Sequence, residues 1–187
     1  AAGTASAAFI QLENPLVLQQ DASVSVELVG KWAGAEGDVY FLGSKSAGEP
    51  LSASADTGVP GLGTRLFASA GARGSTVELG DFTAGTELHF AYHITKGYSD
   101  IVALGDTFRS DLQQDEIQLG WDPEASSSLV YRLGWEDIRD PKRSDWDYQD
   151  VVFDVRMTPP QGDQVPTPGA AMLLALSTGV AAARRRR

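Results

Sequence analysis

Five carboxylates gather in a short stretch of the chain and form its strongest candidate for a chemical site. Glu136 and Asp137 follow one strand-like segment, and Asp145, Asp147 and Asp150 precede the next. Carboxylates placed this closely repel one another unless a positive charge lies among them. A calcium ion takes six to eight hard oxygen ligands and tolerates irregular geometry. The spacing therefore predicts a calcium site formed by these five residues.

The same loop also allows an interpretation without a metal. Asp and Ser are ordinary turn formers, and Lys142 and Arg143 could neutralise the acids. The loop is not an EF-hand, because that motif requires glycine where this chain has Asp150. Trp146 and Tyr148 alternate with the acids. This alternation suggests that one set of side chains faces an ion while the other packs against the protein.

Other polar groups in the chain favour simpler interpretations. A second acidic group fits a polar hairpin loop, although it could also supply ligands to the same ion or to another: Asp111, Asp115 and Glu116. The only histidines, His89 and His93, stand about 13 Å apart on a strand at ~3.3 Å per residue and cannot share a metal. We expect them to form a solvent-facing stripe with Glu87.

Catalytic constellations are missing from the sequence. There is no cysteine and no G-x-S-x-G nucleophile motif. The acids crowd into one loop and do not face each other across a groove, as a glycosidase requires. We therefore expect no catalytic residues and no enzyme activity.

The elements that position the acids are predicted to be β-strands. Apolar and polar residues alternate with a period of two in segments separated by turns, and no segment of the body shows a helical period. This pattern predicts an all-β fold, an antiparallel, jelly-roll-like β-sandwich over residues 1–158. Residues 44–63 are small and polar and are expected to form a long loop. The expected strands are 9–12, 16–18, 22–29, 38–42, 65–68, 76–79, 86–94, 117–121, 129–135 and 151–157.

The charge balance excludes some partners. Lys and Arg total 15 against 25 Asp and Glu, and four of the basic residues are the terminal Arg184–Arg187. The body is therefore strongly acidic and would repel nucleic acid, which needs a basic patch. Such a body suits divalent cations or plain solubility, and a solvated acidic surface accounts for most of the charge.

Both ends of the chain suggest export. Residues 1–8 are small, as at a mature end left after removal of a signal peptide. A proline-rich linker is predicted at 159–168, and residues 169–183 form an apolar run with the arginines behind it. This run, expected to be an apolar helix, is shorter than the ~20 residues that span a bilayer comfortably. The arginines would lie on the cytoplasmic side.

The order of these terminal features resembles the sorting tail of exosortase substrates, the PEP-CTERM type. Val165-Pro-Thr-Pro168 stands where that family carries proline-glutamate-proline, and the apolar segment and the arginine cluster of 169–187 follow it. The resemblance implies an exported bacterial protein, held transiently in the inner membrane by its tail. It also implies a sorting or processing protease as a partner and a final location at the cell surface or outside the cell.

The acidic region resembles domain of unknown function 4114. Leu133-Gly-Trp-Glu-Asp-Ile138 followed by Ser144-Asp-Trp-Asp-Tyr-Gln-Asp-Val-Val-Phe153 matches its hallmark, with Gln149 in place of the usual asparagine. That family occurs in bacterial exported and surface proteins, including large adhesins. The resemblance implies a β-sandwich with bound calcium in an extracellular protein, and it implies no reaction.

Three functions are consistent with the sequence. The leading hypothesis is a non-catalytic calcium-binding surface or matrix protein that takes part in adhesion or associates with exopolysaccharide. The second is a self-assembling subunit of an extracellular filament or sheet, in which residues 9–18 or the tail add to a neighbour's sheet edge. The third is a carbohydrate-binding module. Its stacking residues would come from Trp121, Trp135, Trp146 and Tyr98, although Trp121 and Trp135 lie on apolar strand faces and favour the core; Trp32 could be exposed.

Overall fold

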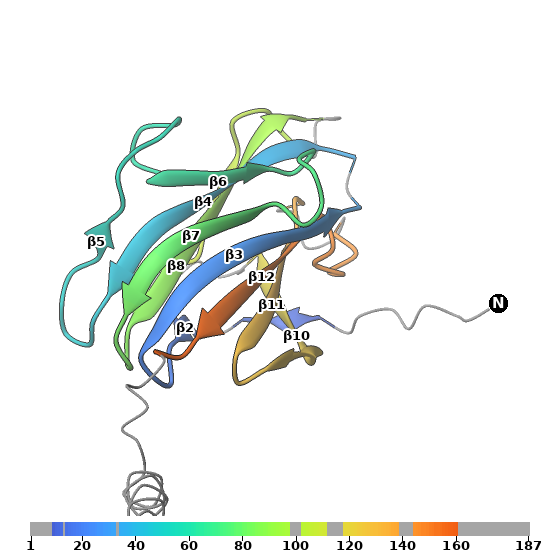
Figure 1. Ribbon diagram of the computed structural model, residues 1–187. Coiled ribbons are helices and arrows are strands. Elements are labelled where there is room, and N and C mark those ends of the chain that lie inside the picture. The colour runs from blue at the N-terminus through green and yellow to red at the C-terminus, as the bar shows by residue number, and fades with distance from the viewer. Residues whose placement is uncertain are drawn as a thin grey trace, which may run out of the picture.

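Two antiparallel sheets pack face to face in the computed structural model, which describes residues 9–12, 14–32, 34–97, 102–111, 118–138 and 144–160 (Figure 1). The first sheet has the order β1-β10-β11-β12-β3-β7. The second has the order β2-β8-β4-β5, with β6 also paired to β4 and β9 to β8. The strands are β1 (Ile10–Gln11), β2 (Leu16–Val17), β3 (Ala22–Lys31), β4 (Glu36–Lys45), β5 (Ser52–Ala53), β6 (Thr64–Ala68), β7 (Thr76–Phe82), β8 (Glu87–Lys96), β9 (Thr107–Arg109), β10 (Leu119–Ser127), β11 (Val130–Trp135) and β12 (Val151–Thr158). The predicted antiparallel β-sandwich is confirmed.

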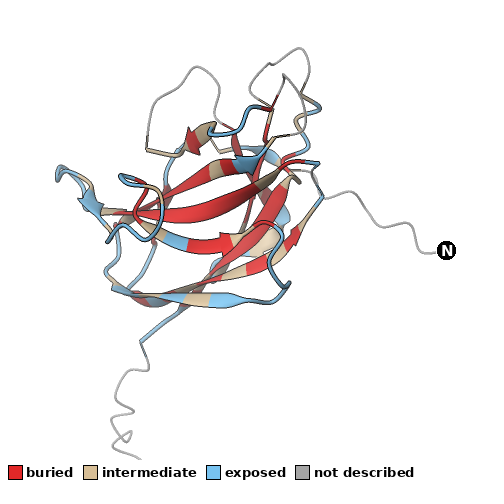
Figure 2. Cartoon of the chain, turned by 90° about the horizontal axis from the view of Figure 1, so that it is seen from above, coloured by how far each residue is buried: buried red, intermediate tan, exposed pale blue. Residues whose placement is uncertain are grey.

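The core forms where the apolar faces of the two sheets meet. In β3, Val24, Val26 and Leu28 are buried while the residues between them point outward, as the period of two predicts. Phe90 of β8 contacts Phe153 of β12 across the sandwich, with ring centroids 5.4 Å apart. Buried residues lie mainly in the strands that face the other sheet, and many exposed residues lie in the turns (Figure 2). The core therefore fixes the relative position of β11 and β12, which flank the acidic loop.

The outer face of the second sheet is covered as well. The segment 46–63 contains β5 and buries Leu62 against Tyr40 and Ala91. His89, which shares this outer face, is only 5% exposed, and its Nε2 lies 3.4 Å from a carboxylate oxygen of Glu87. The expectation of a solvent-facing histidine stripe is therefore wrong for His89. Alternation predicts on which face of the sheet a side chain lies. It does not show whether another segment of the protein packs over that face.

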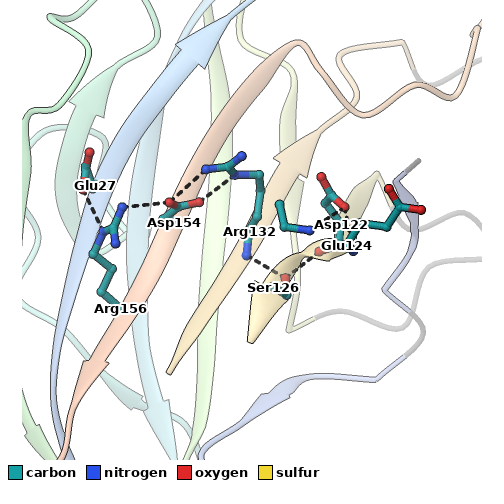
Figure 3. A network of polar contacts seen from close by, with 8 residues as sticks. Glu27, Asp122, Glu124, Ser126, Arg132, Asp154 and Arg156 are labelled. Atoms are coloured by element: carbon teal, nitrogen blue, oxygen red, sulfur yellow. Dashed lines mark hydrogen bonds and ion pairs between the residues drawn. The ribbon is translucent and has the colours of Figure 1, made fainter. Parts of the chain in front are cut away.

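A chain of ion pairs ties together the outer faces of β11, β12 and β3 (Figure 3). Asp154, 1% exposed, accepts two hydrogen bonds from Arg132, at 2.8 and 3.1 Å, and one from Arg156 at 3.0 Å. Arg156 in turn donates to Glu27 at 2.7 Å. Because each charged group in this network has a partner of opposite charge, the buried carboxylate of Asp154 is neutralised. The network fastens β11 and β12 to β3.

Several predictions fall on residues outside the described part of the chain. These are the stacking residue Tyr98, the acids Asp115 and Glu116, the bases Lys142 and Arg143, the start of the chain at 1–8, and the end from residue 161, which includes the apolar tail and its arginines. Within the described ranges, no helix is long and apolar enough to cross a membrane.

Candidate calcium site

The acidic site lies where β11 ends and β12 begins. Trp135 and Val151 are cross-strand partners, so Glu136 leaves one strand next to the point where Asp150 enters the other. Two backbone hydrogen bonds hold this junction, from the Asp150 N–H to the Trp135 carbonyl at 3.1 Å and from the Glu136 N–H to the Gln118 carbonyl at 2.8 Å. The strand register therefore brings the two acidic groups together.

The loop before β12 rests on two glycines of the first sheet. Tyr148 is buried over Gly120 of β10 and Gly134 of β11, which are cross-strand partners. A Cβ atom at Gly134 would overlap the carbonyl oxygen of Tyr148, and one at Gly120 would lie 2.5 Å from its ring. Trp146 and Tyr148 both have φ near 54°, a left-handed conformation that is uncommon outside glycine. The loop can follow this path because Gly120 and Gly134 have no side chains where Tyr148 lies.

All five acids predicted from the sequence meet in this region as two overlapping triads. The first is Glu136, Asp137 and Asp150, and the second is Glu136, Asp145 and Asp147. Within each triad, one oxygen from every carboxylate lies within 4.8 Å of the others. Glu136 and Asp137 are each 1% exposed, Asp150 is half-buried, and Asp145 and Asp147 are exposed.

The buried carboxylates are incompletely satisfied. Oε2 of Glu136 and Oδ2 of Asp137 are inaccessible to solvent and have no hydrogen-bond partner. Oε1 of Glu136 accepts from the Ile138 N–H at 3.3 Å, and Oδ2 of Asp150 accepts from the Asp137 N–H at 2.5 Å. Among the described residues, no Lys or Arg forms an ion pair with any of the five acids. Two buried carboxylate oxygens of this site therefore have no hydrogen-bond partner.

Burial and mutual repulsion raise the pKa values of the first triad. Burial is the largest cause for all three acids, and it raises the pKa of Glu136 to about 7, that of Asp137 to about 6 and that of Asp150 to about 8. Neighbouring carboxylates raise each value further, while Lys31 lowers that of Asp137. Without a cation, these three carboxyl groups therefore keep their protons to a higher pH than ordinary acids do.

Sequence reasoning missed the residues that position the acids. Gln118 donates from Nε2 to the Ile138 carbonyl at 2.7 Å, and Ser144 interacts with the Glu136 carboxylate. The Trp32 N–H donates to the Gln149 carbonyl at 3.2 Å and so attaches the loop to the end of β3. These contacts depend on the order β10-β11-β12-β3, which no local pattern reveals. Ser144 could have been found, since it adjoins the acidic run.

Asp111 lies apart from both triads. Its carboxylate makes a two-point contact with Arg109, with both nitrogen–oxygen distances at 2.9 Å. An acid neutralised in this way is a poor metal ligand. This arrangement favours the polar-loop interpretation for Asp111 over a metal-binding one.

The donor chemistry of the triads suits a hard cation. Every ligand is a carboxylate oxygen, and neither triad includes histidine. Zinc, copper and nickel sites use imidazole or thiolate donors, whereas carboxylate oxygens suit Ca²⁺, Mg²⁺ and Mn²⁺, and Mg²⁺ demands near-ideal octahedral geometry. The two triads therefore offer the kind of oxygen donors that hard cations such as Ca²⁺ take.

Comparisons with protein-family models, with curated proteins and with solved structures gave no match for this chain. The resemblances to domain of unknown function 4114 and to exosortase sorting tails therefore stay predictions.

Proposed function

We propose that this chain is a non-catalytic, calcium-binding module of an exported bacterial protein that acts at the cell surface or in the extracellular matrix. One observation carries the proposal: Glu136 and Asp137 are buried beside Asp150, and each keeps a carboxylate oxygen without a partner. A buried unpaired charge costs several kcal/mol. A calcium ion between these oxygens would remove that cost.

The proposed role is structural and adhesive. Calcium would join the end of β11, the start of β12 and the loop before it, and so make the sandwich more stable where calcium is plentiful. Extracellular calcium modules work at dissociation constants of about 0.1–1 mM. The acidic body and the resemblance to surface proteins support this location. Adhesion or association with exopolysaccharide is the function that such a module would serve.

Thermal unfolding with and without calcium tests the proposal. Calcium that binds only the folded state adds about 2.7 kcal/mol at 100 times its dissociation constant. For a domain of this size, we expect the midpoint to rise by about 5–10 °C relative to chelator-treated protein. Glu136→Gln should fold, because burial already favours a neutral side chain there, and its midpoint should not respond to calcium. An equal rise for Glu136→Gln, or none for the wild type, would contradict the proposal.

A groove on the sandwich supports carbohydrate binding as a second function. It measures about 610 Å³, lies beside β1 and β2, and is lined by Trp121 and Tyr131 with amide side chains from Gln11, Asn14 and Gln19. Among the described residues, no charged side chain lines it. Aromatic rings with amides suit a neutral glycan, which stacks its apolar ring face and hydrogen-bonds its hydroxyls.

Trp121 is thus the stacking residue of this second candidate, whereas Trp135 is fully buried in the core. A glycan array of the wild type and of Trp121→Ala distinguishes the two proposed functions. Binding of a neutral glycan that is lost in Trp121→Ala would support the groove as a site. Binding that is unchanged in Trp121→Ala would reject the groove.

A further inference from the structure

We infer that the site holds two calcium ions of unequal affinity, joined by the carboxylate of Glu136. This inference rests on the proposed calcium-binding function. The five acids form two triads that share only Glu136. A carboxylate has two oxygens and can therefore bridge two cations.

The spacing of the oxygens favours two ions over one. Calcium binds oxygen at 2.3–2.6 Å, so two ligands of one ion lie no more than about 5 Å apart. Each triad meets this limit, with its oxygens within 4.8 Å of one another. The structure places Asp137 and Asp150 in one triad and Asp145 and Asp147 in the other. A single ion could not bind both Asp137 and Asp150 and also Asp145 and Asp147 unless the loop moved.

The two positions differ in burial, and this difference predicts unequal affinity. The inner position is formed by Glu136, Asp137 and Asp150, and it includes both residues that have an unpartnered carboxylate oxygen. An ion there replaces missing hydrogen-bond partners and lies away from water. The outer position adds the exposed Asp145 and Asp147 to Glu136. An ion there keeps water among its ligands and competes with solvent, so it binds more weakly.

The charge of the site also fits two ions. Five ionised carboxylates carry five negative charges, so one calcium leaves three uncompensated and two leave one. Lys31 is a described basic residue whose charge acts on the site, and it lowers the pKa of Asp137. A second divalent ion therefore brings the cluster close to neutrality, which a partly buried site requires.

Native mass spectrometry of the full chain across a calcium titration tests the inference. The wild type should bind two ions in separate steps. Asp147→Asn should keep the first step and weaken the second on the order of tenfold or more, since calcium affinity follows the number of charged ligands. Asp150→Asn should weaken the first step. Glu49→Gln, an exposed acid outside the site, is the matched control and should keep both steps.

The possible failures can be told apart. One ion at saturating calcium, or loss of both ions together in Asp147→Asn, would overturn the two-ion inference and leave the calcium-binding function intact. No bound ion in folded wild-type protein, with folding checked by circular dichroism, would overturn both.

Discussion

At the scale of single residues, the site depends on carboxylates kept where water cannot reach them. Glu136 and Asp137 are each 1% exposed, yet neither forms an ion pair with a described basic side chain. Asp154, equally buried, lies between Arg132 and Arg156. A buried aspartate is therefore neutralised by basic side chains at Asp154, whereas Asp137 has no such partner among the described residues. This contrast within one molecule is the main reason to infer a metal.

The raised pKa values predict how stability depends on pH. Acids whose folded pKa exceeds the ordinary value favour the folded state at low pH, and this contribution is lost as pH rises through the folded pKa. Burial and repulsion raise the pKa values of Glu136, Asp137 and Asp150 to about 7, 6 and 8, so calcium-free protein should lose several kcal/mol of stability between about pH 4 and 8. Saturating calcium should remove this loss, because the ion needs ionised ligands.

Urea unfolding at pH 5 and pH 8, with calcium removed or saturating, measures the effect. Asp150→Asn should reduce the loss in calcium-free protein, since an amide carries no charge at either pH. Stability of calcium-free wild type that stays level or rises over this interval would mean that another group neutralises the cluster.

At the scale of elements, the position of the loop depends on small residues in its neighbours. Gly120 and Gly134 are paired across β10 and β11, and Tyr148 lies on them. The ion-pair chain through Asp154 fastens β11 and β12 farther along the same strands. The acids therefore converge for two reasons. The two glycines let the loop lie directly on the sheet, and the ion pairs of Asp154 hold β11 and β12 together.

Gly134→Ala tests the support of the loop. The new methyl group would overlap the backbone of Tyr148 and push the loop off the sheet. We expect calcium affinity to fall on the order of tenfold or more, with about 1–3 kcal/mol lost from stability through overpacking. Val130→Ala, at the other end of β11, should lower stability without changing the affinity measured by calorimetry. Unchanged affinity in Gly134→Ala would show that the loop does not need this contact.

At the scale of the whole molecule, the sequence predicts the sandwich well because its signal is local. Alternation in β3 follows directly from a sheet with one buried face, whereas β8 and β12 are buried on both faces over most of their length. β5 and β9 are too short, at two and three residues, to show a period. The burial of His89 was missed because it depends on what covers the outer face of the second sheet.

The candidate site, too, could be predicted from the sequence only in part. The five acids could be predicted, since they crowd into one stretch of sequence. Their separation into two triads could not, because it depends on strand register and on the path of the loop over Gly120 and Gly134. The half-buried placement of Trp121 beside a groove also depends on the distant segment that contains β1 and β2.

The most direct test of the central claim is an atomic structure of the protein crystallised with calcium, with anomalous difference density used to locate the ion. We predict a peak at about 2.3–2.6 Å from carboxylate oxygens of Glu136, Asp137 and Asp150. A site without that peak at millimolar calcium, with these carboxylates bonded to one another or to a basic side chain such as Lys142, would contradict the account.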